Sequence, residues 1–430
     1  MRSLTLASGL KRTGANNPWQ WIPSLYLIEG LPNAIVVTVA VVLFKNLGLD
    51  NSRVALYTSL MYLPWVIKPF WSPFVDIFGS KRRWILAMQL LMAAGIASIA
   101  LSLRSTWWLA TSLAAFWGVA FCSATHDIAA DGFYMLALDE RRQAMFVGIR
   151  STFYRLATLL ASGGVVWLAG RLMNSGIEIA VAWQIMMASL AVLFLLAALW
   201  HWKVLPTPPS DRPARARTVG DILTDFVLTF KTFILRPNLV VALTFMLLYR
   251  LPEALLCKMV QPFLLDPLAD GGLGLTTEQV GLANGTFGVI GIVAGGIIGG
   301  LAIARYGLRR CIWPMALALT LPSGFYCYLA AVQPQTMPLI CSGIAIEQLG
   351  YGFGFTAYMM YMMKFCEGSE FTTSHYAFCT GIMALGLMLP GLGAGSLQMA
   401  LGSYEAFFAV VMLLCSATFI VTAIARRHLD

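Results

Sequence analysis

The stretch VLPTPPSDRPARAR, from Val204 to Arg217, opens the longest polar interval of a 430-residue chain that is otherwise strongly apolar. Proline lacks the backbone N–H that a helix needs, and arginine is costly to bury in lipid. The interval runs from Lys203 to Arg236. It therefore predicts a linker between two apolar parts of the chain.

Long apolar runs lie on both sides of this linker. The chain is 59% hydrophobic and 11% charged, with a mean hydropathy of +0.75, whereas about a quarter of the residues of a soluble domain are charged. Runs of about 20 apolar residues span a bilayer as helices. We predict an all-α polytopic membrane protein with twelve transmembrane helices, at roughly 19–44, 54–78, 84–103, 107–136, 144–170, 179–202, 237–265, 277–304, 311–331, 337–364, 372–400 and 404–425.

The positive charges orient these helices. Most of the 29 Lys and Arg fall on one side of the predicted membrane, and the other side holds only Lys45, Arg53, Arg104 and Arg171. Because cytoplasmic loops carry the excess of basic residues, both termini are predicted to be cytoplasmic, and the first 17 residues form an uncleaved tail. The net charge of +9 then reflects topology and contact with anionic lipid, and we expect no nucleic acid partner.

The chain divides into a six-helix half at 1–202, a cytoplasmic linker at 203–236 and a second six-helix half at 237–430. Apolar residues recur at helical spacing in the second part of the linker, which predicts an amphipathic helix on the membrane surface. They are Val219, Ile222, Leu223, Phe226, Val227, Phe230, Phe233 and Ile234.

The two halves repeat short motifs. EGLPNA (Glu29 to Ala34) is echoed by YRLPEA (Tyr249 to Ala254), and FGSKRR (Phe78 to Arg83) by YGLRR (Tyr306 to Arg310). Together these matches indicate a duplicated six-helix unit, the parallel repeat of the major facilitator fold, with a cavity between the halves near the membrane midplane. Pro32 and Pro252 predict kinks in the first helix of each half, although ordinary tolerance of proline in membrane helices is the alternative.

Charged residues inside the first half predict a proton-coupling site, because intramembrane charges commonly mark proton relays. From the turn between helices four and five, Asp127 lies roughly 14 Å and Arg155 roughly 16 Å deep at a rise of ~1.5 Å per residue. We therefore predict that Asp127 pairs with Arg155, as a switch or as a permanent structural bridge, with Glu29 as a second carboxylate. Asp131 and Arg150 match in depth as well. Lys68 either snorkels to the interface or pairs.

A second group of polar residues predicts the wall of a substrate cavity. Arg250 and Glu253 share a helical face and either bind a substrate carboxylate or neutralise each other. The remaining candidates are Lys258, Glu347, Tyr351 and, from the first half, His126.

Two basic loops predict a cytoplasmic gate. In the first half it comprises Asp76, Gly79, Arg82 and Arg83, which resemble the loop motif of major facilitator proteins, and in the second half Arg309 and Arg310. The eight cysteines form no CxxC motif, and the four histidines lack the spacing of metal ligands. We expect no cofactor, no metal and no catalytic residue.

Several of these segments resemble the AmpG-like muropeptide permeases of the major facilitator superfamily, a branch that also holds siderophore importers and acetyl-CoA transporters. They are IKPFWSPFVD, FCSATHDIAAD, FYRLA, RLPE, GVIGIVAGGIIGG, IEQLGYGFGFTAYM and SHYAF. The chain departs from the family's pattern at Glu29, at His126 and at Tyr134-Met135-Leu136.

The resemblance implies a monomeric permease of the bacterial inner membrane that imports anhydromuropeptides with protons for cell-wall recycling. A siderophore importer is the nearest alternative. A membrane-embedded transferase is a third possibility, but the sequence shows no catalytic pair or metal site at headgroup level. A sensor without transport is disfavoured by the internal repeat.

Overall fold

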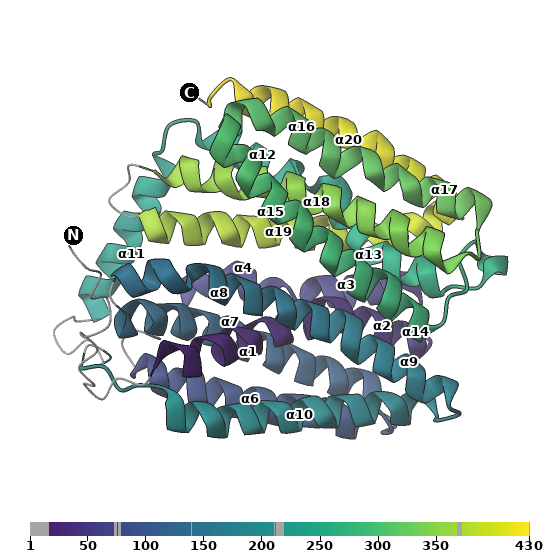
Figure 1. The fold of residues 1–430 in the computed structure, drawn as a ribbon, viewed down its shortest axis with the longest axis horizontal. Coiled ribbons are helices and arrows are strands. Elements are labelled where there is room, and N and C mark those ends of the chain that lie inside the picture. Colours follow the sequence, from purple (N-terminus) through teal and green to yellow (C-terminus); the bar gives the residue numbers. More distant parts are fainter. Residues whose placement is uncertain are drawn as a thin grey trace, which may run out of the picture.

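The computed structural model describes residues 17–72, 75, 79–138, 140–209, 211, 219–367 and 372–429. These residues form helices and no strands, packed lengthwise as one bundle (Figure 1). The first 16 residues of the predicted N-terminal tail, half of the proline-rich stretch at 204–217 and Asp76 lie outside the described residues.

The first half, from η1 to α10, occupies one side of the bundle in Figure 1. Its apolar runs become helices because they bury their backbone hydrogen bonds internally, as lipid requires. The elements are η1 (Pro18–Gln20), α1 (Ile22–Ala34), η2 (Ile35–Val39), α2 (Ala40–Asn46), α3 (Asn51–Leu60), α4 (Leu63–Ile67), η3 (Lys68–Phe70), α6 (Lys81–Ser102), α7 (Trp108–Ala137), α8 (Glu140–Leu159), η4 (Leu160–Val165), α9 (Val166–Asn174) and α10 (Ile179–Val204).

The second half, from α12 to α20, forms the other side of the bundle, and α11 (Val219–Ile234) lies across one end (Figure 1). The elements of the second half are α12 (Leu239–Leu248), α13 (Leu251–Leu265), η5 (Leu268–Asp270), α14 (Thr277–Val280), η6 (Gly281–Gly288), α15 (Val289–Tyr306), α16 (Leu308–Thr320), η7 (Leu321–Ser323), α17 (Gly324–Val332), α18 (Met337–Cys366), α19 (Thr372–Leu401) and α20 (Tyr404–Arg426).

Ten helices of the described residues are long and apolar enough to cross a membrane. The predicted runs at 54–78 and 337–364 are not among them. The first is divided into α3, α4 and η3, whereas the second is a single 30-residue helix, α18, whose apolar pattern is diluted by Glu347, Gln348 and glycines. The count of twelve and the side on which the termini lie stay predictions.

The halves meet through matching elements. The second predicted helix of the first half (α3) packs against the fifth of the second half (α19), and the fifth of the first half (η4) packs against the second of the second half (η6). At the latter contact the backbones touch, since a Cβ built on Gly285 would lie 2.0 Å from the Ser162 carbonyl oxygen. This reciprocal pairing is what a duplicated unit produces.

The two predicted proline kinks have different outcomes. At Pro252 the helix is interrupted: α12 ends at Leu248 and α13 begins at Leu251, which leaves Arg250 in a non-helical conformation. The first helix instead continues through Pro32 and changes to π spacing at Ile35–Val39. The break in the second half is what turns Arg250 toward the aromatic residues described below.

The linker helix α11 is held to the second half by its own side chains. Phe233 is buried against Phe365 and Phe378, and the Thr232 hydroxyl lies 3.1 Å from His375 Nε2. Other apolar side chains of the helix, among them Val227 and Ile234, are exposed. That these contact the membrane surface stays a prediction.

Candidate functional site

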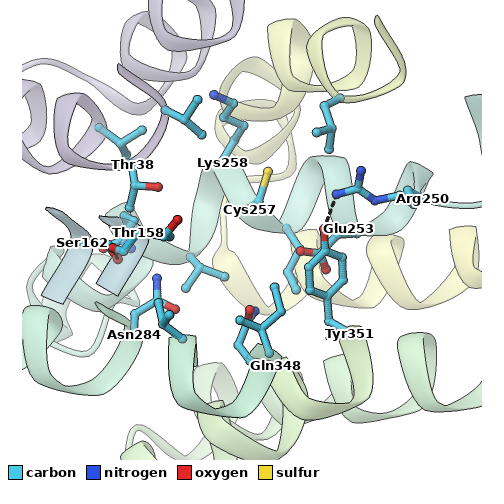
Figure 2. A pocket seen from close by; sticks show the side chains of 18 of the residues that line it. Thr38, Thr158, Ser162, Arg250, Glu253, Cys257, Lys258, Asn284, Gln348 and Tyr351 are labelled. Carbon is cyan, nitrogen blue, oxygen red and sulfur yellow. Dashed lines mark hydrogen bonds between the residues drawn. The ribbon is translucent and has the colours of Figure 1, made fainter. Parts of the chain in front are cut away.

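A cavity of about 210 Å³ lies between the two halves. Its wall includes Thr38 and Thr158 from the first half and Arg250, Lys258 and Tyr351 from the second, and Figure 2 shows these side chains surrounding it. Helix α13 contributes a polar stripe along one face, at Arg250, Glu253, Cys257, Lys258 and Gln261. Four of the predicted cavity residues are therefore brought together here: Arg250, Glu253, Lys258 and Tyr351.

Arg250 is buried and lies among aromatic rings rather than against a carboxylate. Its guanidinium donates to the Tyr351 hydroxyl (Figure 2) and sits 4.7 Å from the ring centroid of Phe355 and 5.7 Å from that of Tyr358. Within the described residues no ion pair of 4.0 Å or less joins it to Glu253, so the predicted direct pair is absent. The reason is the helix break at Arg250, which removes the regular three-residue spacing on which that prediction depended.

Lys258 is the second buried cation of the cavity, with 1% of its surface exposed. Its ammonium lies 3.3 Å from the Thr58 hydroxyl and 4.9 Å from the centroid of the Tyr62 ring. No carboxylate of the described chain lies within 4.0 Å of it. Buried cations usually have an anionic partner, so the cavity wall offers two positive groups to an anion from outside the chain.

Glu347 and His126 lie off the cavity. Glu347 is fully buried behind it and accepts hydrogen bonds from Gln348 and Tyr326 at 2.8 and 3.4 Å. His126 faces the packed interior of the first half, where its Nε2 lies 3.0 Å from the Gln89 amide, which in turn contacts His201. The prediction that His126 lines the cavity is wrong, because its side chain faces Gln89 of α6 inside the first half.

The Asp127 carboxylate pairs with Lys68 at 3.2 Å and not with Arg155. The predicted pair is therefore wrong, and the pairing alternative for Lys68 is correct. Arg150 instead binds Asp131 at 2.9 Å. Arg155 faces the second half, with its guanidinium next to Gly296 of α15. Arg150 and Arg155 are five residues apart, about 140° around the helix, so α8 directs one into its own half and the other out of it.

Glu29 completes this group of charges in the first half. It is 6% exposed, and its Oε2 is buried without a hydrogen-bond partner. That Glu29 and Asp127 bind and release a coupling proton stays a prediction.

The described gate residues of the first half lie at the start of α6, next to the linker. Arg82 donates to the carbonyl oxygens of Trp202 and Leu205, and the Asp211 carboxylate accepts from the Lys81 and Arg82 backbone N–H groups at 2.6 and 3.0 Å. These bonds attach the linker to the first turn of α6. Gly79 precedes that turn beside Trp84, and Arg83 donates its backbone N–H to Ser80.

The matching residues of the second half stand at the start of α16. The Arg309 carbonyl oxygen accepts from Arg426 of α20, and the side chain of Arg310 is exposed. A role of Arg309 and Arg310 in gating stays a prediction.

A polar network that sequence reasoning missed joins the halves at the opposite end of the bundle from α11. Lys45 Nζ lies 2.5 Å from Asp266 Oδ1, and Asn51 donates to Asp266, Gln398 and Tyr404 at 3.2, 3.1 and 2.7 Å. We call these five residues the polar seal. Its members lie at the ends of apolar runs and resemble ordinary loop residues in sequence. Asn46 with Thr277, and Ser52 with Ser396, extend the contact.

The comparisons with known proteins agree with this geometry. The model of the Major Facilitator Superfamily matches residues 24–387. The chain belongs to the Major Facilitator Superfamily. Its members are secondary transporters, and the chain is thus a multi-pass membrane transporter of a small-molecule substrate and not an enzyme.

Relatives in sequence include the anhydromuropeptide permease of Escherichia coli (strain K12), which is 26% identical over 378 residues, covering 85% of this chain and 71% of the relative. The putative transporter AmpG 4 of Rickettsia conorii is 24% identical over 409 residues, covering 92% and 94%. The resemblance to AmpG-like permeases is confirmed.

Solved structures confirm the major facilitator fold. A bacterial homologue of the human lysosomal transporter Spinster, in an inward-facing and unoccupied conformation, superposes with a TM-score of 0.69 at 15% identity, covering 96% of this chain and 98% of the other. The D-xylose–proton symporter gives 0.69 at 12% identity, covering 93% of this chain and 96% of the other.

The polar seal leads to a first prediction about this major facilitator protein. The Ser52 and Ser396 hydroxyl oxygens are 2.7 Å apart across the halves, so paired Ser52→Cys and Ser396→Cys are close enough for a disulfide. Oxidation is expected to lower uptake in proportion to the cross-linked fraction, and reduction to restore it, because alternating access requires this end to open. Each single variant controls for the eight native cysteines. Full uptake by the cross-linked protein would show that this end does not open.

Proposed function

We propose that the protein is a proton-coupled importer of anhydromuropeptides across the bacterial inner membrane, serving cell-wall recycling. The relatives named as AmpG transporters and as anhydromuropeptide permease support the substrate class. The ligand is then a disaccharide, GlcNAc–anhydroMurNAc, with or without an attached peptide that bears carboxylates.

The observation that carries the proposal is the pair of buried cations on the cavity wall. Arg250 and Lys258 are 6% and 1% exposed, and within the described residues neither has a carboxylate within 4.0 Å. A guanidinium can bind a carboxylate through two parallel hydrogen bonds. An anionic substrate would therefore supply the charge that the wall lacks, while Tyr351 and Tyr62 provide flat surfaces for sugar rings.

The size of the cavity requires a conformational change. Small-molecule sites enclose about 300–1,000 Å³, and about 210 Å³ is too little for a disaccharide. With the polar seal closed, the cavity would widen by movement of the halves at the end that carries α11. The proposed cycle loads and unloads substrate by opening one end at a time.

The proposed coupling site is the group formed by Glu29, Asp127 and Lys68. A proton bound to Asp127 removes the negative charge that holds Lys68, so the ion pair weakens and η3 is freed from α7. Loss of the proton restores the pair. Because Lys68 stands at the end of α4, which packs against α19 of the second half, this change reaches the interface between the halves. Arg155 faces the same interface and is the remaining proposed member of the coupling group.

Uptake into proteoliposomes tests the proposed function. Radiolabelled GlcNAc–anhydroMurNAc peptide should accumulate when an inward proton gradient is imposed and should stop accumulating when a protonophore is added. A labelled siderophore under the same conditions should remain outside. Uptake of the siderophore and not of the muropeptide would show that the substrate is a siderophore. Uptake that is unaffected by the protonophore would refute proton coupling.

A further inference from the structure

Two buried carboxyl groups of the second half have no role in the coupling group described above. Glu253 of α13 is 6% exposed and lines the cavity, whereas Glu347 of α18 is fully buried behind it. Each has one buried oxygen without a hydrogen-bond partner, Oε2 of Glu253 and Oε1 of Glu347. The other oxygen of Glu347 accepts from Tyr326 and Gln348. One incompletely satisfied acid thus lines the cavity, and a second is buried behind its wall.

The surroundings of these acids contain little positive charge at short range. In the described part of the chain, neither carboxylate has a cation within 4.0 Å, since Arg250 is turned to Tyr351 and Lys258 to Thr58. Glu347 and Glu253 are close to each other, because Tyr326 and Gln348, which donate to Glu347, line the same cavity as Glu253. The remaining titratable groups that face the pair come from α13, α17, α18 and α20 and are Cys257, Tyr326, Tyr351 and Cys415.

Two ionised carboxylates are not stable in this arrangement. An unpaired buried charge costs several kcal/mol, and two like charges that share a site oppose each other's ionisation. At least one proton must therefore stay on the pair.

We propose that Glu253 and Glu347 form a proton-binding site of the second half, distinct from Glu29 and Asp127 of the first half. This inference rests on the proposed proton-coupled transport and adds a second place at which a proton is bound.

The position of the pair links its proton to substrate binding. Glu253 is three residues from Arg250, whose Nε is buried and without a partner. When Glu253 is ionised, it competes with an incoming carboxylate for Arg250; when it is protonated, Arg250 is available to the substrate. Binding of an anionic substrate should therefore strengthen as the pH falls and should be accompanied by uptake of a proton.

The test uses the full-length protein in detergent and compares Glu253→Gln and Glu347→Gln with wild type. Glutamine keeps the size of the protonated acid and cannot titrate. Binding of labelled GlcNAc–anhydroMurNAc peptide is measured across about pH 5 to 8, and proton uptake on binding is measured with a pH-indicator dye. Glu405→Gln, the same change at an exposed position of α20, is the matched control, and Glu253→Asp restores a titrating group.

In wild type and Glu405→Gln, substrate binding is linked to the uptake of one proton. The Kd should therefore fall by up to about tenfold for each unit by which the pH is lowered. In Glu253→Gln the Kd should be nearly independent of pH, and proton uptake should fall by about one proton per substrate. Glu253→Asp should restore both the pH dependence of Kd and the proton uptake. Glu347→Gln should flatten the same profile. Wild-type profiles in both glutamine variants would overturn the second site while leaving proton-coupled import intact. An absence of proton-driven uptake in wild-type proteoliposomes would instead refute the proposed function.

Discussion

Asp127→Asn is expected to lower proton-driven uptake by about 100-fold, near the upper end of the roughly 1.5–3 kcal/mol that a hydrogen bond to a charged group contributes. The substitution removes the proton acceptor of the coupling group and leaves Lys68, which lies 3.2 Å away, without its carboxylate. The measurement is initial uptake of labelled anhydromuropeptide into energised vesicles. Immunoblotting of the membrane fraction checks that equal amounts of protein are present.

Two further variants separate a switch from a structural bridge. Asp127→Asn combined with Lys68→Gln removes both charges, so a merely structural pair would regain proton-driven uptake in the double variant. We expect uptake to stay low, because no titrating group remains at the pair. Asp131→Asn is the matched control one helical turn away. Its carboxylate is held by Arg150 and Tyr26, and we expect its uptake to stay within a few-fold of wild type.

Arg250→Lys is expected to weaken substrate binding by about 10- to 100-fold, which corresponds to roughly 1.5–3 kcal/mol for hydrogen bonds to a charged group. Lysine keeps the positive charge but lacks the planar fork that binds a carboxylate and stacks on aromatic faces. The guanidinium lies 4.7 Å from the Phe355 ring centroid and bonds to Tyr351, so its orientation is set before substrate arrives. Equilibrium binding of the labelled substrate measures the effect.

The control for this prediction is Arg53→Lys, because Arg53 is an exposed arginine paired only with neighbouring Asp50 among the described residues. The double variant Arg250→Gln with Glu253→Leu tests the competing idea that Arg250 only neutralises the charge of Glu253. If it did, the double variant would bind substrate normally. Since no ion pair joins the two side chains in the structure, we expect binding to stay weak.

Properties that depend on neighbouring residues along the chain were predictable from sequence. Hydropathy placed the apolar runs, and the proline-rich linker and the paired Leu-Pro motifs indicated two related halves. The family followed from motifs such as FCSATHDIAAD and RLPE. The cluster of Arg250, Glu253, Lys258 and Tyr351 could also be predicted, because three of these residues fall between positions 250 and 258 of the chain and cannot be far apart.

Which charges pair was decided by the tertiary structure alone. Depth along a helix follows from the rise per residue, and it correctly matched Asp131 with Arg150, yet it matched Asp127 with Arg155 equally well. The choice depends on how α8 is rotated about its axis. That rotation is set by packing: a Cβ on Gly30 would lie 2.7 Å from the Tyr154 carbonyl oxygen, so α1 and α8 meet closely on the Arg150 side. Arg155 is left facing the other half, and Lys68, from a segment broken into short helices, takes its place beside Asp127. The polar seal arises in the same way, since contacts between residues such as Lys45 and Asp266 exist only once the halves have assembled.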